Sequence, residues 1–356
     1  MATDLEVFWD TVSHRRPSRV LYSFGFTPDL ERRVKEHIGT ENWGEYYGTF
    51  MHAPNGLRRP ANTPPLDFSK YWHGQTLPEG TVINDMGVAM VPGGFYHFLR
   101  RIAPLRNATS LKEIEEYPLE DMTKFDYSGV GAAIEKAHAQ GKVVSGGGAG
   151  MYEKAWDIRG YEPFLMDMIE RPAWAQCLLD RIAEENMYCA AQFAKAGVDL
   201  MPLGDDVANQ KSMMFHPSMW REMIHSRWAK IWDAVHRINP KCQIEYHSDG
   251  NIMAAIPDMV DAGLNILNPL QPECLDIDKV YKDFGHILSF NGTIGTQSTM
   301  PWGTPQDVRA RVKEVIEKYG KNGGLFISPT HVLEPEVPLA NIDALVAACK
   351  EFGGNG

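Results

Sequence analysis

Short apolar runs that end abruptly in polar residues recur through the second half of the chain. The runs cover residues 200–203, 243–246, 264–267, 287–290 and 325–327. Stretches with helical spacing lie between most of them, and this strand-helix alternation predicts a parallel sheet. If the strands close into a (β/α)8 TIM barrel, their polar ends meet on the face where such barrels carry out chemistry. Alternation alone does not distinguish that barrel from an open doubly wound sheet.

The first part of the chain is less regular. Residues 20–24 and 142–145 are predicted strands, and residues 1–18 are a predicted helix. Further helices are expected at 28–38, 110–116, 130–140, 164–169, 172–195, 217–238, 252–261, 275–284, 304–319 and 341–352. Residues 40–100 have little periodicity, which predicts an irregular insert or lid over the cleft, or a small β-rich insert. With no obvious linker, residues 1–356 are expected to form a single α/β domain.

Composition narrows the classes of function. The chain has 35 basic and 46 acidic residues, a net charge of −11, which disfavours a nucleic-acid or anionic-membrane partner. The N-terminal residues lack a signal-peptide pattern, and no apolar run is long enough for a membrane span. Five cysteines without paired spacing indicate a reducing compartment. We therefore expect a cytoplasmic protein that acts on a small molecule.

Histidines and a carboxylate follow two of the predicted strands. His247 and Asp249 flank Ser248 directly after the run 243–246, and His331 follows the run 325–327. Imidazole and carboxylate together suit zinc or another divalent transition metal. His247, Asp249 and His331 are therefore candidate metal ligands. The alternative for Asp249 is a hydrogen-bonded turn that ends the strand.

Three carboxylates are candidates for catalysis. Asp206 follows Gly204 and Asp205 at a strand end, where neighbouring side chains point in opposite directions, so at most one of the two aspartates faces the centre. It could act as general base, metal contact or substrate contact, or it could cap a helix. Glu153 follows a glycine run at 146–148 that permits close backbone approach to a ligand. Asp85 lies in the irregular insert.

The candidate substrate contacts are polar or aromatic residues near the same strand ends. They are Trp156, Arg159, Asn268, Gln271 and Asn291. The amides of Asn268 and Gln271 can recognise a substrate oxygen, although Asn268 before Pro269 is equally typical of a turn. Trp156 is otherwise an ordinary packing residue.

These motifs, in this order, resemble the uroporphyrinogen decarboxylase superfamily. The matching segments are 15–20, 160–165, 204–206, 247–250, 268–271, 291–295, 303–305, 328–331 and 338–341. The resemblance covers nearly the whole chain and is best from about residue 110. It implies a (β/α)8 barrel with its cleft at the carboxyl ends of the strands. Homodimers are common in the superfamily.

The superfamily holds two chemistries. Porphyrinogen decarboxylases use an arginine-rich motif to hold substrate carboxylates, whereas the matching residues 23–28 here contain no arginine. Asp85 could match the catalytic aspartate of that branch. Zinc-dependent methyltransferases, which move methyl groups between a methylated corrinoid protein and a thiol, carry His-x-Cys and a later Cys. The matching positions here are His247, Asp249 and His331, so both cysteines are replaced.

The resemblance thus implies a metal-dependent methyltransferase or demethylase for a small methylated compound. No Asp-x-His-x-x-Gly motif is present, so a corrinoid would have to come on a separate partner protein. Two alternatives stay open. One is a decarboxylase of a small organic acid or porphyrinogen-like substrate, and the other is a barrel that binds a small molecule without catalysis.

Overall fold

A parallel sheet forms the centre of the fold. A computed structural model describes residues 2–53, 56–61, 63–93, 99–148 and 150–354. Its parallel strands are β6 (Leu200–Gly204), β7 (Gln243–His247), β8 (Ile266–Asn268) and β9 (Ser289–Phe290). A second parallel pair joins β1 (Met51–His52) to β5 (Val143–Val144). All these strands point in the same direction, as the sequence predicts.

Further pairings close the sheet into a ring. Parallel bridges join Ser145 to Leu200, Phe290 to Leu325, and Tyr22 to Ile327. The backbone N–H of Phe50 donates to the carbonyl of Tyr22 at 3.4 Å, which connects the first strand segment to β1. Strand segments near residues 22, 51, 144, 202, 245, 267, 290 and 326 therefore follow one another around a closed (β/α)8 barrel. The prediction of a TIM barrel is confirmed.

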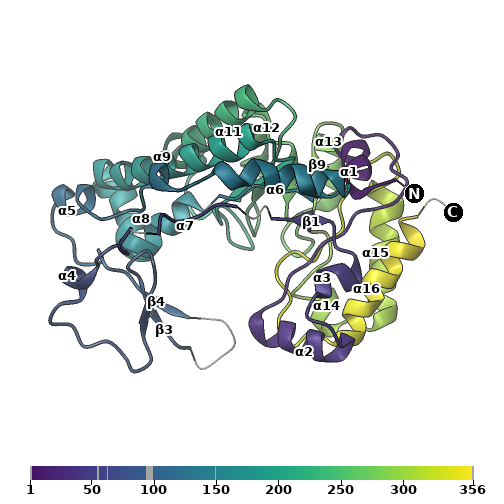
Figure 1. Ribbon diagram of the computed structural model, residues 1–356, viewed down its shortest axis with the longest axis horizontal. Coiled ribbons are helices and arrows are strands. Elements are labelled where there is room, and N and C mark those ends of the chain that lie inside the picture. Colours follow the sequence, from purple (N-terminus) through teal and green to yellow (C-terminus); the bar gives the residue numbers. More distant parts are fainter. Residues whose placement is uncertain (1, 54–55, 62, 94–98, 149, 355–356) are drawn as a thin grey trace.

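Helices surround the barrel and extend beyond it (Figure 1). They are α1 (Asp4–Val12), α2 (Pro28–Ile38), α3 (Trp43–Tyr47), α4 (Ser69–Trp72), α5 (Leu111–Glu115), η1 (Met122–Lys124), α6 (Ser128–Ala139), α7 (Met151–Arg159), α8 (Tyr161–Glu170), α9 (Pro172–Ala196), α10 (Pro217–Met219), η2 (Trp220–His225), α11 (Ser226–Ile238), α12 (Ile256–Asp261), α13 (Ile277–Phe284), α14 (Thr299–Trp302), α15 (Pro305–Tyr319) and α16 (Leu339–Phe352). None of the helices described in the structure has the length and apolar character needed to cross a bilayer.

Local sequence signals set several helix ends. Helix α2 begins at Pro28, whose fixed φ suits a first turn, and ends at Gly39, which has φ +72°. Helix α15 begins with a capping box between Thr304 and Asp307. The helix expected over residues 1–18 ends earlier, at Val12.

The insert differs in part from the expectation. Residues 51–52 pair with β5 and belong to the barrel, so the irregular region does not begin at residue 40. The strands β2 (Val82–Ile83), β3 (Ala89–Val91) and β4 (Arg100–Ile102) form an antiparallel sheet, which is the β-rich form of insert that the sequence left open. Figure 1 shows this sheet in a lobe below α7 and α8, across an open space from α2 and α14.

An apolar cluster fills the barrel at the amino ends of its strands. Its buried members are Val7, Phe8, Leu21, Phe50, Val143, Leu200, Ile266 and Phe326. Val7 and Phe8 come from α1, and the others come from barrel strands. Helix α1 therefore packs against the end of the barrel opposite the carboxyl ends of the strands.

Candidate metal centre

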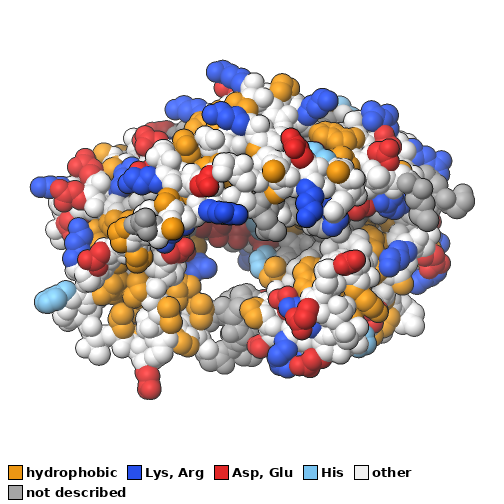
Figure 2. Space-filling view, viewed as in Figure 1, with side chains coloured by type: hydrophobic (Ala, Val, Ile, Leu, Met, Phe, Trp, Pro, Cys, Tyr) orange, Lys and Arg blue, Asp and Glu red, His pale blue; other side chains and the backbone are white. Residues whose placement is uncertain are grey.

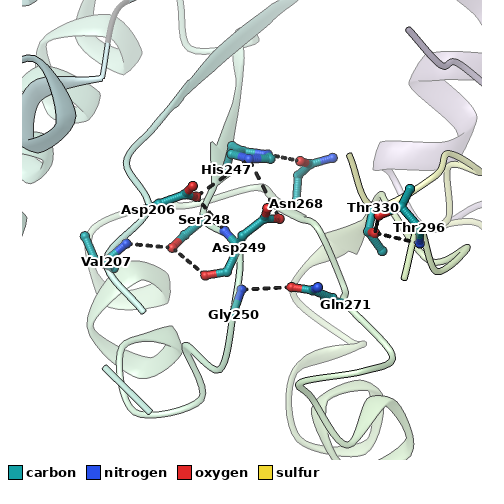
Figure 3. A network of polar contacts seen from close by, with 10 residues as sticks. All are labelled: Asp206, Val207, His247, Ser248, Asp249, Gly250, Asn268, Gln271, Thr296 and Thr330. Carbon is teal, nitrogen blue, oxygen red and sulfur yellow. Dashed lines mark hydrogen bonds and ion pairs between the residues drawn. The ribbon is translucent and has the colours of Figure 1, made fainter. Parts of the chain in front are cut away.

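Three side chains converge where β6 and β7 end. Asp206, His247 and Asp249 each offer a ligand atom, and these atoms all lie within 4.8 Å of one another. His247 Nε2 is 3.8 Å from Asp206 Oδ1 and 4.0 Å from Asp249 Oδ1. Figure 3 shows the three side chains pointing toward one another. In Figure 2, acidic side chains and a histidine are visible inside the central opening of the molecule.

Backbone hydrogen bonds fix the turn that carries the centre. The N–H of Asp249 donates to Asp206 Oδ1 at 2.8 Å, which ties the end of β7 to the end of β6. The N–H of Gly250 donates to Gln271 Oε1 at 2.9 Å, and the N–H of Val207 donates to Ser248 Oγ at 3.1 Å. These bonds hold the backbone around Asp206 and Asp249 before any cation binds.

Asn268, at the end of β8, orients His247. The Asn268 Oδ1 atom lies 2.6 Å from His247 Nδ1. Because an amide oxygen only accepts hydrogen bonds, Nδ1 carries the hydrogen and Nε2 is free to face the carboxylates. Burial lowers the pKa of His247, but Asp249, Asn268 and Asp206 together raise it above its ordinary value.

One carboxylate oxygen of Asp249 is buried near the imidazole of His247. This oxygen, Oδ1, has no hydrogen-bond partner among the described residues. Burial raises the pKa of Asp249, as do Asp206 and Glu273, whereas His247 and His331 oppose the rise. Buried polar atoms normally find partners. This oxygen, beside a second carboxylate and an imidazole, suits a bound cation.

The two adjacent aspartates have separate roles. Asp205 is fully buried; its Oδ1 accepts from the N–H groups of Tyr152 (2.7 Å) and Glu153 (3.2 Å), and its Oδ2 from Trp228 Nε1 (2.8 Å). Asp205 therefore caps the amino end of α7, and Asp206 faces the centre. The sequence analysis expected at most one of the two to face the centre, and in the structure Asp206 is the one in the ligand group.

Glu153 lies beside the same centre. It is in the first turn of α7, which the sequence analysis did not identify as a helix. Burial raises the pKa of Glu153, Asp206 raises it further, and His247 and Arg101 lower it. Glu153 thus interacts electrostatically with Asp206 and His247 and is suited to hold a proton there.

His331 is close to the cluster but does not belong to it. Its ring centroid is 6.3 Å from that of His247, and its side chain is exposed. Among the described residues, the group close enough to share one ion consists of Asp206, His247 and Asp249. The structure thus puts Asp206 in the position that the sequence analysis gave to His331.

Two candidate residues lie elsewhere. Arg159 is 2% exposed; its Nε donates to Asp167 Oδ2 at 2.6 Å and its Nη1 to the carbonyl of Leu105 at 2.6 Å. The prediction that it contacts substrate is wrong, because its donors hold the fold together. Asp85 lies in the exposed turn between β2 and β3 and lines a hollow of the insert with Arg59 and Glu120, outside the group of described residues that could share one ion.

The amide side chains that were predicted to contact substrate form hydrogen bonds within the protein. Asn268 orients His247, and Gln271 holds the backbone of Gly250. Asn291 is buried, with both amide atoms bonded to protein groups. Their assignment as direct substrate contacts is therefore replaced by positioning roles. Trp156 is half-buried, and the guanidinium of Arg101 lies 5.3 Å from its ring centroid.

The glycines near the centre are required by close packing. A Cβ at Gly148 would lie 2.2 Å from Leu203 Cδ2, so this glycine accommodates β6 rather than a ligand. The backbone φ of Gly204 is +148°, and a Cβ there would lie 2.1 Å from the carbonyl oxygen of His247. The glycine lets the ends of β6 and β7 approach closely.

Gly204→Ala is therefore expected to disturb the centre. Because the clash is with backbone, β6 and β7 must separate, and we expect a loss of about 2 kcal/mol in the free energy of unfolding. Zinc affinity should fall as well. Urea unfolding and zinc titration measure both. Gly131→Ala, where a Cβ meets nothing within 4 Å, is the matched control. Equal behaviour of the two variants would contradict this role of Gly204.

The fold and the strand-end cluster define an α/β barrel with a histidine and carboxylates at its carboxyl face. The family model for uroporphyrinogen decarboxylase (URO-D) matches residues 98–352. The chain belongs to the uroporphyrinogen decarboxylase family, as the order of its motifs indicates. A comparison with curated proteins gave no match.

A solved structure with a TM-score of 0.70 shares this fold. A methyltransferase from Methanosarcina mazei aligns with a TM-score of 0.70 at 19% identity, covering 99% of each chain. A GH10 structure from Paenibacillus barcinonensis aligns with a TM-score of 0.36 at 11% identity, covering 59% of this chain and 70% of that chain. An endo-1,4-β-xylanase from Caldicellulosiruptor owensensis gives 0.37 at 10% identity, covering 67% and 88%.

Proposed function

We propose that this protein is a metal-dependent methyltransferase or demethylase that acts on a small methylated compound. The observation that carries the proposal is the cluster of Asp206, His247 and Asp249, with a buried oxygen on Asp249 that makes no hydrogen bond within the described residues. Membership of the URO-D family and a fold shared with a methyltransferase support it.

The donor set fits zinc or another divalent transition metal. Asp206, Asp249 and Nε2 of His247 would hold the ion, and Asn268 would orient the imidazole, as outer partners of metal-bound histidines do. Two carboxylates and one imidazole make a harder site than thiolates would. When bound, the metal would act as a Lewis acid toward the oxygen or nitrogen that carries the methyl group.

The reaction also needs a proton and a methyl acceptor. When the bond from methyl to oxygen or nitrogen breaks, its electron pair stays on that atom, which then takes up a proton. In this proposal Glu153 provides the proton, because burial favours its neutral form. The acceptor must supply an electron pair to the methyl carbon. We propose a corrinoid carried by a separate protein in this role.

Transfer of isotopically labelled methyl groups tests this function. The zinc-loaded protein would be incubated with ¹³C-methyl-labelled methoxy and N-methyl compounds, with cob(I)alamin or a thiol as acceptor. We expect label on the acceptor and a large loss of rate in Glu153→Gln. Release of carbon dioxide from small acids, without methyl transfer, would contradict the proposal and favour a decarboxylase.

Asn268→Ala should weaken metal binding without removing any ligand. The variant leaves Nδ1 of His247 without its partner, so the ring can rotate or change tautomer. We expect zinc affinity to fall by about 10–100-fold, which is typical for loss of such a partner. Isothermal titration with zinc measures the change. An unaltered affinity would show that Asn268 does not orient the ligand.

A further inference from the structure

The interior of the barrel is polar directly above its apolar cluster. Residues two apart on a strand share a face, so the residues that follow Leu21, Val143 and Phe326 on the inward face are Ser23, Ser145 and Ser328. Branched apolar side chains usually fill such layers. Here several neighbouring strands contribute hydroxyl groups instead.

A hydrogen-bonded chain crosses this layer. Asn291 Nδ2 donates to Glu245 Oε2 at 3.0 Å, and Ser328 Oγ donates to Asn291 Oδ1 at 2.8 Å. Glu245 is on β7, whereas Asn291 directly follows β9, and β8 lies between these two strands. A side-chain contact that passes over β8 must run through the barrel interior, so all three side chains point inward.

Space remains beside these polar residues. Ser23, Ser145, Glu245 and Ser328 keep 6–9% of their surface accessible to water, whereas the strand residues of the apolar cluster keep at most 3%. A water-sized probe therefore touches residues of the polar layer and hardly touches those of the apolar one. His247 lies two residues beyond Glu245 on β7, so this space is directly beneath the metal centre.

We propose that this space is a well that binds a hydroxyl or amine group of the substrate. Glu245 offers carboxyl oxygens to a donor, and the serine hydroxyls can donate or accept. Among the described side chains of this layer none is basic, so the layer itself offers no counter-charge to a carboxylate or phosphate. The substrate class is thus a compound with a hydroxyl or amine group. This proposal rests on the proposed function only because it assumes that the substrate binds in the same cleft.

The side-chain amide of Asn291 is a reporter inside the well. Its NMR signals, assigned with Asn291→Asp, would be followed in wild-type protein during titrations with ethylene glycol and, separately, with acetate. The two probes match in size and differ in charge. We expect ethylene glycol to produce a saturable shift with and without zinc, and acetate to produce none in the zinc-free protein.

Substitutions of the serines that line the well test the proposal directly. Ser23→Val should weaken ethylene glycol binding about tenfold, the effect of losing one hydrogen bond. Ser328→Ala, which removes a hydroxyl without adding volume, should also weaken ethylene glycol binding. Ser18→Val, at an exposed position before the same strand segment, should have no effect. Equal responses to acetate and ethylene glycol, or unchanged binding in both well variants, would overturn the proposal. Glycol binding without zinc binding would support the well and contradict the metal centre.

Discussion

His247→Ala is expected to reduce zinc affinity by more than the roughly 100-fold that loss of an outer partner can cost. The substitution removes the imidazole and leaves Asp206 and Asp249 facing each other without a cation to balance them. His247 is half-buried at a strand end, outside the apolar cores, so the fold should persist. Elemental analysis and zinc titration measure the loss, and circular dichroism checks the fold.

His331→Ala is the matched control for that variant. It removes a neighbouring imidazole whose ring centroid is 6.3 Å from that of His247 but which lies outside the ligand cluster. We expect zinc affinity to change little. Retention of zinc by His247→Ala, or its complete loss from His331→Ala, would show that the ligand set is misassigned.

Arg159→Ala is expected to lower the free energy of unfolding by about 3–5 kcal/mol, the usual cost of breaking a buried ion pair. Arg159 and Asp167 are both almost fully buried, and the variant also removes one of two donors to the carbonyl of Leu105, which keeps the N–H of Ala108. Arg171, which is 2.7 Å from Asp167, would remain and limit the loss. Urea unfolding measures the change.

Zinc affinity distinguishes a structural role of Arg159 from a role in the site. It should be the same in Arg159→Ala as in the wild type. Arg171→Ala, which removes the more exposed partner of Asp167, should cost less stability. Full stability of Arg159→Ala combined with weakened substrate binding would restore the interpretation as a substrate contact.

The sequence predicts the alternation of elements because local rules govern it. Apolar runs marked β6 to β9, and Pro28 and Gly39 bounded α2. Barrel closure depends on the pairing of Tyr22 with Ile327 and with Phe50, which brings distant segments together. A local sequence pattern does not predict pairing between distant segments. The role of residues 51–52 as a barrel strand was missed for the same reason, since only two residues pair.

The candidate site was predictable at its strand ends and not beyond them. His247 ends β7, and Asp206 and Asp249 lie two residues beyond the ends of β6 and β7, so alternation placed them on one face. Arg159 was misassigned because a sequence does not reveal that Asp167 neutralises it inside the protein. Helix α7 did carry a signal: Met151, Ala155 and Ile158 have helical spacing and are buried.

The metal content of the wild-type protein tests the central claim most directly. The protein would be dialysed against zinc, freed of excess ion, and measured by inductively coupled plasma mass spectrometry together with Asp206→Ala and Asp249→Ala. We expect about one zinc per chain in the wild type and a loss of zinc in both variants. A wild-type protein that retains no zinc or other divalent transition metal after such treatment would contradict the account.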